Sequence, residues 1–473
     1  MTSSILVVNS QEVRLADKEG IDIPILDLIK LVGKNLAKEY VRRNFPWKVL
    51  FAVGPGNNGN DGLSFAKALY ERNFLVRICN LFPEVSNPIR DWFINNLPKD
   101  IFVRPEEVQN LANEFVFVDA MFGIGQRPNL PDIVLSFLEM SKKFRKRIAV
   151  DVPTGIDCDT GEVFKEVVWD ETFCVQAIKV GLCVGQASVL SGRKTAIDCN
   201  IRFPQYSYNY FGTDDTGQIV GIYDLKDIVP RRHPLSHKYF YGPVGIIAGS
   251  EQMFGAAIFA SQGALCSGAS FLKVFSLTDK VLLPEGLFVR VSKYSAEDLE
   301  PVKISKIKSA VFGPGVDCFE PSVFDLLKSL QIPVVVDAGG LTKSIPVLTR
   351  QFILTPHFGE FERMLGGSFK NIFNTLKNFS EDREVNILLK GPTLIFQGDR
   401  SFIFEIKNSK LSMGGLGDFM AGLITGFLAQ GMDPFQSSLL ATLVIAKSGL
   451  KSFWNLQSII QNAKREVAEL FLL

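Results

Sequence analysis

Short apolar runs alternate along this chain with longer segments whose apolar positions recur every three or four residues. Residues 22–45 carry this helical spacing and predict an amphipathic helix. The runs WKVLFAVG, LVRICNLF, EFVFVDA and RIAVD follow, separated by polar turns and helical stretches. Strands that alternate with helices predict an α/β domain built on a parallel sheet.

The alternation returns in the second half, in VGIIAGS, SAVFGPGVD, IPVVVDAGGL, FILTPHFGEFERML and NILLKGPTLIFQGD. Between the halves, residues 201–235 lack this alternation of apolar runs and helical segments. They are rich in Pro, Gly, Asn, Asp and Tyr, as expected at a domain boundary. The sequence therefore predicts two α/β domains, at residues 1–215 and 222–473, and the second should also have a parallel sheet.

A glycine-rich segment, MGGLGDFMAGLITGFLAQG, closes the second half at residues 413–431. Gly414, Gly415 and Gly417 lead into Asp418 and then into an apolar helical pattern. A helix beginning there would offer free N–H groups and a positive dipole end to a phosphate, and the dipole would help to keep the carboxylate ionised. An anion site beside a carboxylate suits phosphoryl transfer. The alternative is a turn whose Asp only caps the helix.

Another glycine-rich segment, GPGNNGNDG, follows the first apolar run at residues 54–62. A strand, a glycine loop and a helix in succession can hold a small anionic ligand, although neither GxGxxG nor a P-loop lysine is present. Oxygens of Asn57, Asn58, Asn60 and Asp61 suit an alkali cation and a ribose as much as a phosphate. The alternative is a solvated turn, since these are common turn residues.

Polar residues also follow two later runs in the first half. Asp119 ends EFVFVDA, Asp151 ends RIAVD, and Thr154 stands three residues further on. Ligands of open α/β sheets gather at the carboxyl ends of strands, so we expect these residues to converge with Asn58. A lone strand-end Asp is more often a cap, but three polar loops at one sheet edge indicate a site.

Composition restricts the class of protein. The chain has 473 residues, is 47% hydrophobic and 21% charged, and carries a net charge of +1, so it predicts a buried core and no attraction to nucleic acid or membranes. Its seven cysteines are scattered without a CxxC pair, which argues against a zinc site or a disulfide framework. The first residues lack a signal layout, and no apolar run is long enough for a membrane span. We therefore expect a cytoplasmic enzyme.

The first half contains GPGNNGNDGLSFAKAL, DAMFGIG, VDVPTGIDCDTG and ETFCVQAIKVGL, which resemble segments of the NAD(P)H-hydrate epimerase (YjeF N-terminal) family. The resemblance implies a Rossmann-like fold and interconversion of the R and S epimers of hydrated nicotinamide cofactors. It also implies a K⁺ ion held by Asn58, Asp119 and Thr154, where the family usually has Ser at the last position.

Asp151 is the candidate general base of this domain, since opening and reclosing a hydrated carbon requires proton transfers. The substrate contacts implied by the resemblance are Asn57, Asn58, Gly59, Asn60, Asp61, Gly123, Ile124, Gly125, Gln126, Arg127, Pro128, Asn129 and Asp151.

In the second half, GPG, TPHFGE, LLKG and GGLGD together resemble the ADP-dependent NAD(P)H-hydrate dehydratase (YjeF C-terminal) family, whose fold is ribokinase-like. An epimerase domain followed by a dehydratase domain resembles the bifunctional repair enzymes. The resemblance implies that ADP drives loss of water from C6 of S-NAD(P)HX, which yields NAD(P)H, AMP and phosphate. Mg²⁺ is expected between the phosphates, as in other phosphoryl transfers.

Asp418 would deprotonate the C6 hydroxyl while the amides of residues 414–417 stabilise the transferring phosphate. The residues implied for the hydrated cofactor are Ala256, Gly315, His357 and Asp418. Those implied for ADP or AMP are Lys390, Gly391, Pro392, Thr393 and Gly417. The chain departs from the family at Gly339, where DAGGL replaces DADAL, and at KGPT, which is one residue shorter than KGxxT.

Two other hypotheses stay open on the sequence. The GxGD loop also fits a ribokinase-like kinase of a vitamin-type alcohol fused to an epimerase-like domain. The other is a cofactor-binding protein whose catalysis has decayed, although the intact Asp151 and Asp418 argue against it. For the favoured enzyme we expect NADHX, NADPHX and ADP as small-molecule partners, no nucleic acid or membrane, and a homo-oligomer.

Overall fold

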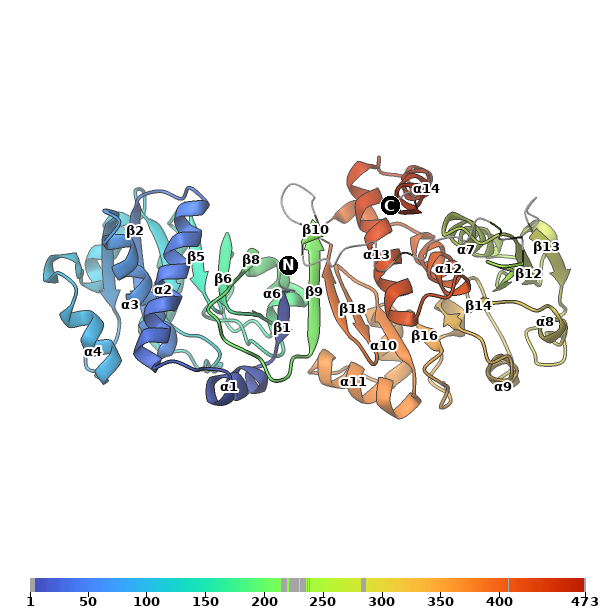
Figure 1. Ribbon diagram of the computed structural model, residues 1–473, viewed down its shortest axis with the longest axis horizontal. Helices are drawn as coiled ribbons and strands as arrows, with labels where there is room; N and C mark the ends of the chain where they lie inside the picture. The colour runs from blue at the N-terminus through green and yellow to red at the C-terminus, as the bar shows by residue number, and fades with distance from the viewer. Residues whose placement is uncertain are drawn as a thin grey trace. The chain divides into compact units, whose positions relative to one another are not determined.

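The computed structural model describes residues 5–213, 219–220, 229, 235, 237, 239–281, 286–406 and 408–471. The chain divides into two compact units, Ile5–Tyr208 and Asn209–Leu473 (Figure 1). The boundary predicted between residues 215 and 222 lies outside the described residues, apart from Ile219 and Val220.

The first unit is built on a six-stranded parallel sheet in the order β3-β2-β4-β5-β6-β8. Its strands are β2 (Lys48–Val53), β3 (Leu75–Asn80), β4 (Val116–Ala120), β5 (Arg147–Val150), β6 (Glu171–Val175) and β8 (Arg193–Ile197). Outside this six-stranded sheet, β1 (Leu6–Val8) pairs in parallel with β7 (Ile178–Lys179). The parallel sheet predicted from the apolar runs is confirmed.

Helices cover both faces of this sheet. They are α1 (Ser10–Glu19), α2 (Ile25–Arg42), α3 (Asn57–Tyr70), α4 (Pro88–Asn95), α5 (Asp132–Ser141) and α6 (Gly185–Leu190). Side chains of β2 alternate between two cores: Val49 and Phe51 pack with α2 and α3, whereas Leu50 and Ala52 pack with α5. A strand buried on both faces explains why these runs are continuously apolar.

The segment expected to be a glycine loop after β2 is largely helical. Helix α3 begins at Asn57, with Gly56 as its N-cap, so only residues 54–56 form the turn. A Cβ placed on Gly59 would lie 2.0 Å from the carbonyl oxygen of Gly54. The helix can therefore start directly against the strand end because position 59 has no side chain, and the predicted loop at residues 57–62 is wrong.

The sheet of the second unit follows the order β13-β12-β11-β14-β15-β16-β17-β18-β19-β9, with β10 paired to β9. Its strands are β9 (Tyr208–Thr213), β10 (Ile219–Val220), β11 (Val244–Ile247), β12 (Leu272–Ser276), β13 (Gly286–Arg290), β14 (Ser309–Phe312), β15 (Val334–Val336), β16 (Phe352–Leu354), β17 (Asn386–Leu389), β18 (Thr393–Gln397) and β19 (Phe402–Glu405). The strands from β13 to β17 are parallel, as predicted.

Strands β18 and β19 instead run antiparallel to their predecessors, so a wholly parallel sheet is wrong for this unit. The reason is the short connection between β17 and β18, residues 390–392. A parallel crossover requires about a dozen residues or more, so the chain turns back as a hairpin. This hairpin carries the KGPT segment.

The helices of the second unit are α7 (Phe254–Cys266), α8 (Pro301–Ile304), α9 (Ser322–Ser329), α10 (Phe358–Leu365), α11 (Ile372–Arg383), α12 (Leu416–Ala429), α13 (Pro434–Lys451) and α14 (Leu456–Phe471). Helices α7, α12, α13 and α14 share one large apolar core with the sheet (Figure 1). In the described ranges, no helix is both long and apolar enough to cross a membrane.

Helices α7 and α12 approach each other at backbone distance. A Cβ added to Gly263 would lie 2.1 Å from the oxygen of Phe419, and one added to Gly422 would lie 1.9 Å from the oxygen of Ala260. This contact sets the position of α12, whose first turn carries Asp418.

We expect Gly422→Ala to lower the free energy of unfolding of the second unit by about 1–3 kcal/mol, because the methyl group must separate two packed helices. Urea unfolding followed by circular dichroism measures the change. Gly367→Ala is the matched control, since a Cβ at that position meets nothing within 4 Å. Equal stability of the two variants would contradict the close α7–α12 contact.

Candidate active sites

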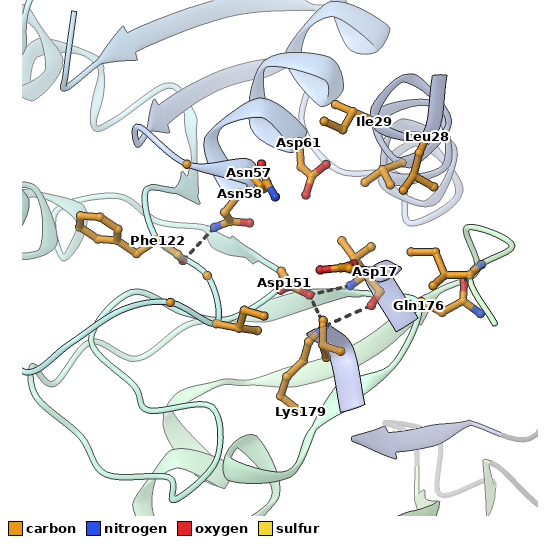
Figure 2. A pocket seen from close by; sticks show the side chains of 18 of the residues that line it. Asp17, Leu28, Ile29, Asn57, Asn58, Asp61, Phe122, Asp151, Gln176 and Lys179 are labelled. Atoms are coloured by element: carbon orange, nitrogen blue, oxygen red, sulfur yellow. Dashed lines mark hydrogen bonds and ion pairs between the residues drawn. The ribbon is translucent and has the colours of Figure 1, made fainter. Parts of the chain in front are cut away.

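A cavity of about 410 Å³ lies in the first unit at the carboxyl ends of its parallel strands (Figure 2). Helix α2 supplies an apolar side, formed by Ile25, Leu28, Ile29 and Val32. The polar side chains in the wall are Asp17, Asn57, Asn58, Asp61, Gln126, Asp151, Gln176 and Lys179. An apolar wall facing a few convergent polar groups, at this volume, is typical of small-molecule sites.

Asp151 follows β5 directly and is held in an unusual conformation. Its φ of 64° is left-handed, which costs on the order of 1–3 kcal/mol for a residue other than glycine, and strained residues of this kind recur at active sites. Its Oδ1 accepts a hydrogen bond from the Val175 amide at 3.1 Å and forms an ion pair with Lys179 Nζ. The surrounding fold therefore orients this carboxylate.

Lys179 is a buried cation, with only 1% of its side chain exposed. Its ammonium also donates to the carbonyl oxygens of Val175 and Ala177, both at 3.1 Å. Burial alone would lower the pKa of Lys179, but the Asp151 carboxylate outweighs burial and raises that pKa above its ordinary value. Lys179 is therefore protonated at neutral pH, and its ammonium group pairs with the Asp151 carboxylate.

The three residues predicted to hold K⁺ meet behind this cavity. Asp119 Oδ1 accepts from Thr154 Oγ1 at 2.8 Å and from the Met121 amide at 3.0 Å, and Oδ2 accepts from the Thr154 amide at 2.8 Å. Asn58 Nδ2 donates to the Phe122 oxygen at 2.8 Å, and the Phe122 amide donates to Thr154 Oγ1 at 3.1 Å. One hydrogen-bonded cluster thus joins the ends of three chain segments.

This cluster fits a monovalent cation. Asn58 Oδ1 is buried and has no hydrogen-bond partner among the described residues. Burial raises the pKa of Asp119 to about 6 despite its hydrogen bonds. The described chain holds no cluster of three or more His, Cys, Asp and Glu suited to a metal, but carbonyl, hydroxyl and single carboxylate oxygens suffice for a hard cation. A cation would compensate the buried charge of Asp119.

The cavity brings together part of the predicted substrate set. The predicted contacts in its wall are Asn57, Asn58, Asp61, Gly123, Ile124, Gly125, Gln126 and Asp151. The predicted contacts outside its wall are Gly59, Asn60, Arg127, Pro128 and Asn129. Gln126 also joins two of the turns, since its Oε1 accepts from the Gly155 amide at 2.7 Å.

The sequence patterns did not indicate Lys179 or Asp17, although both line the cavity. A single lysine within the apolar run QAIKVGLCV was the available signal for a buried ion pair. No comparable signal marked Asp17, because helix α1 is positioned by a distant contact. Asp159 accepts hydrogen bonds from the amide and hydroxyl of Ser10, at 2.7 and 2.5 Å.

In the second unit, Asp418 lies in the first turn of α12, after Gly415 with a φ of 84°. Burial and then the Asp337 carboxylate raise the pKa of Asp418 to about 7, while Lys390 opposes the rise. These effects outweigh the contribution of about 0.3–1 kcal/mol that the helix dipole is expected to make to ionisation of this carboxylate. A carboxyl group with a pKa near 7 suits proton transfer at neutral pH.

An ion pair between Lys390 and Asp337 lies beside this turn. Lys390 Nζ is 2.6 Å from Asp337 Oδ1, and 1% of the Asp337 side chain is exposed. A Cβ added to Gly417 would lie 3.2 Å from Lys390 Nζ and 3.9 Å from Asp337 Oδ2. The hairpin after β17, the end of β15 and the start of α12 therefore converge.

The other residues predicted to contact the hydrated cofactor lie in two places, with Gly315 beside Ala256 and His357 at the start of α10. Gly315, with a φ of 65°, packs against α7, since an added Cβ would lie 3.0 Å from the Cβ of Ala256. His357 caps α10: its Nδ1 accepts from the Glu360 amide at 3.2 Å, and Glu360 Oε2 accepts from the His357 amide at 2.8 Å. Glu360 influences the pKa of Asp418, which brings the start of α10 near the same site.

The departure at Gly339 has a steric explanation. A Cβ at this position would lie 1.7 Å from the carbonyl oxygen of Val316, which belongs to the turn after β14. The carboxylate of a DADAL motif could not be accommodated in this backbone arrangement. Asp337 remains the only acidic residue of the DAGGL segment, and it is the one that pairs with Lys390.

Fold and geometry together define a two-domain α/β protein with a carboxylate-centred site in each domain. Two protein families match the corresponding parts of the chain. The YjeF-related protein N-terminus family matches residues 26–181, and the NAD(P)H-hydrate dehydratase family matches residues 244–465. The expected Rossmann-like first domain and ribokinase-like second domain are confirmed.

Relatives extend over nearly the whole chain. It is 30% identical over 461 residues to the bifunctional NAD(P)H-hydrate repair enzyme Nnr of Archaeoglobus fulgidus, covering 93% of both chains. It is 28% identical over 492 residues to the enzyme of that name from Moorella thermoacetica, covering 92% of this chain and 89% of the relative. The chain belongs to the family of bifunctional NAD(P)H-hydrate repair enzymes.

Among solved structures, about half of the chain is similar to the ADP/ATP-dependent NAD(P)H-hydrate dehydratase from Bacillus subtilis co-crystallized with ATP/Mg²⁺. The identity is 26%, the TM-score is 0.45, and the match covers 52% of this chain and 96% of that one.

The Asp119 cluster predicts that K⁺ raises the melting temperature of the chain more at about pH 7.5 than at about pH 5. The folded pKa of Asp119, about 6, is above its ordinary value, so its stabilising contribution is present at low pH and is lost as the pH rises through 6. K⁺ can take the place of the Asp119 proton only after this carboxyl group has ionised. Thermal denaturation in KCl and in choline chloride of equal ionic strength measures the difference.

Asp119→Asn should remove the pH dependence of this K⁺ effect, because the buried charge is absent. An equal K⁺ effect at both pH values, or the same dependence in the variant, would contradict a cation site at Asp119.

Proposed function

We propose that this chain epimerises R- and S-NAD(P)HX in its first unit and dehydrates S-NAD(P)HX to NAD(P)H in its second, using ADP and releasing AMP and phosphate. The observation that carries the proposal is that each unit has one carboxylate at a candidate site. In the first unit Asp151 follows β5 and pairs with Lys179, and in the second unit Asp418 lies in the first turn of α12. Relatives named as bifunctional repair enzymes align over both units, which supports the same pairing of activities.

In the first unit, Asp151 takes the proton of the C6 hydroxyl, and Lys179 keeps that carboxylate ionised and oriented. As this proton leaves, the electron pair of the C6–N1 bond passes to N1, N1 takes up a proton and C6 becomes an aldehyde carbon; reclosure from the other face inverts C6. Asn57, Gly123 and Gln126 lie where they can hold the substrate against the base. K⁺ bound by Asn58, Asp119 and Thr154 would supply a fixed positive charge beneath the substrate loops.

In the second unit, Asp418 takes the proton of the C6 hydroxyl as its oxygen attacks the β-phosphorus of ADP, and AMP leaves with the electron pair of the broken P–O bond. Phosphate then leaves C6 with the C–O electron pair, and loss of a proton from C5 forms the C5–C6 double bond. The amides at the start of α12 and the Lys390 ammonium face the phosphates and stabilise their charge.

The same residues suit a magnesium nucleotide. Mg²⁺ is usually held by one or two carboxylates together with phosphate oxygens, and Asp337 and Asp418 are the carboxylates at this position. It would neutralise charge on the phosphates. We assign the nucleotide to Lys390, Gly391, Pro392, Thr393 and Gly417, and the hydrated nicotinamide to Ala256, Gly315, His357 and Asp418.

We also assign the protein to the cytoplasm and to a homo-oligomer, with domains at residues 1–215 and 222–473. All seven cysteines are free thiols, which supports a reducing compartment.

Two amide variants separate the activities. Asp151→Asn should reduce epimerisation by about 10²–10⁴-fold and leave ADP-dependent dehydration of the S epimer intact, because it removes only the base of the first unit. Asp418→Asn should do the reverse. Epimer ratios measured by chromatography and NADH recovered with ADP report the two reactions independently.

Asp132→Asn and Asp325→Asn are matched controls, since both side chains are exposed. Loss of both activities in either site variant, with the controls active, would contradict two separate sites. Phosphorylation of pyridoxal in place of NADH recovery would favour the kinase alternative.

The acid limb of kcat/KM for dehydration should lie near pH 7, because Asp418 must be ionised and its pKa is about 7. Asp337→Asn should move this limb to lower pH, since it removes a negative charge that raises the Asp418 pKa and frees Lys390, which lowers it. A limb that stays in place or moves upward in this variant would exclude Asp418 as the titrating base.

A further inference from the structure

The cavity of the first unit contains carboxyl groups that the proposed base does not use. Asp61 of α3 and Asp17 of α1 line the same cavity as Asp151 and Lys179 (Figure 2). Opening the C6–N1 bond requires N1 to gain a proton while the hydroxyl loses one. A site with a base alone therefore lacks half of the proton transfers that the reaction needs.

Asp151 and Asp61 occupy opposite electrostatic environments. Asp151 is compensated by the buried Lys179 ammonium and by the Val175 amide. The half-buried Asp61 carboxyl has no hydrogen bond or ion pair with any part of the chain that the structure describes. Two titratable groups whose surroundings favour opposite protonation states are the usual arrangement of an acid and a base in one active site.

The charged groups that act on Asp61 come from three elements. They are Asp151 after β5, Lys179 in β7 and Asp17 in α1. Helix α2, which packs along α3, presents only apolar side chains to the cavity. Burial, and then the Asp151 charge, raise the pKa of Asp61 well above its ordinary value, while Lys179 opposes the rise. The surroundings of Asp61 therefore favour the protonated form of its carboxyl group.

Asp17 is the rival donor, but its position is less suitable. Its side chain is exposed, whereas Asp61 is half-buried beside Asn57 and Asn58, the predicted substrate contacts. Figure 2 shows Asp61 and Lys179 entering the cavity from opposite sides. A substrate held between them would have the Asp151–Lys179 ion pair on one side and the proton donor, Asp61, on the other.

We propose that Asp61 is a second catalytic residue of the epimerase site, which donates a proton to N1 while Asp151 accepts the proton of the C6 hydroxyl. The C6–N1 bond breaks with its electron pair going to N1, and C6 becomes an aldehyde carbon. Rotation about C5–C6 exposes the other face. Reclosure returns the N1 proton to Asp61 and the Asp151 proton to oxygen, so both groups are regenerated. The inference rests on the proposed epimerase activity.

The test compares Asp61→Asn, Asp61→Glu and Asp17→Asn with the full-length wild-type chain, using purified R-NADHX and following formation of the S epimer across pH. Wild-type epimerisation is established first, so that its absence counts against the proposed function rather than against Asp61. Asp61→Asn should lower kcat by about 10²–10⁴-fold with a smaller change in KM, and Asp61→Glu should restore part of the rate.

The pH profile distinguishes a proton donor from a structural residue. The wild-type rate should fall at alkaline pH as Asp61 loses its proton, and the residual rate of Asp61→Asn should lack this fall. Asp132→Asn serves as the exposed control. Wild-type kcat in Asp61→Asn, an effect on KM alone, or loss of the alkaline fall in Asp17→Asn instead would overturn the proposal.

Discussion

A carboxylate removed from water must be paired with a cation, saturated with hydrogen bonds or protonated, and this constraint organises both sites. In the first unit the buried Lys179 compensates Asp151, and in the second Lys390 compensates Asp337. Asp418, near the second pair, has no ion pair within the described chain, and burial raises its pKa to about 7. Each unit therefore combines a fixed ion pair with a carboxyl group whose proton can move.

The fold could be predicted largely from the apolar runs, because a parallel strand buried on both faces must be apolar at nearly every position. The start of α3 could not be predicted, because a sequence rich in Asn and Gly is typical of turns. The helix begins there because Gly59 and Gly62 pack closely against strand ends. The hairpin at residues 390–392 was also missed, because a short turn and a short loop before a helix look alike in sequence.

Site residues could be predicted where a polar side chain lies at or just after the end of an apolar strand. Asp119, Asp151 and Thr154 are of this kind, and the structure brings them to one end of a sheet. Lys179 was missed because its partner, Asp151, stands 28 residues earlier and only the fold brings them together. The motif change at Gly339 had no explanation in the sequence, since the carbonyl oxygen that excludes a side chain belongs to another turn.

We propose that two sites in one chain act in succession on the same damaged cofactor. The most direct test of this proposal is a single incubation of wild-type protein with pure R-NADHX and ADP, at a pH where spontaneous epimerisation is slow. Two sites that act in succession should give complete recovery of NADH, with one AMP formed for each NADH. An R epimer that persists while added S epimer is consumed, or NADH that forms without AMP, would contradict it.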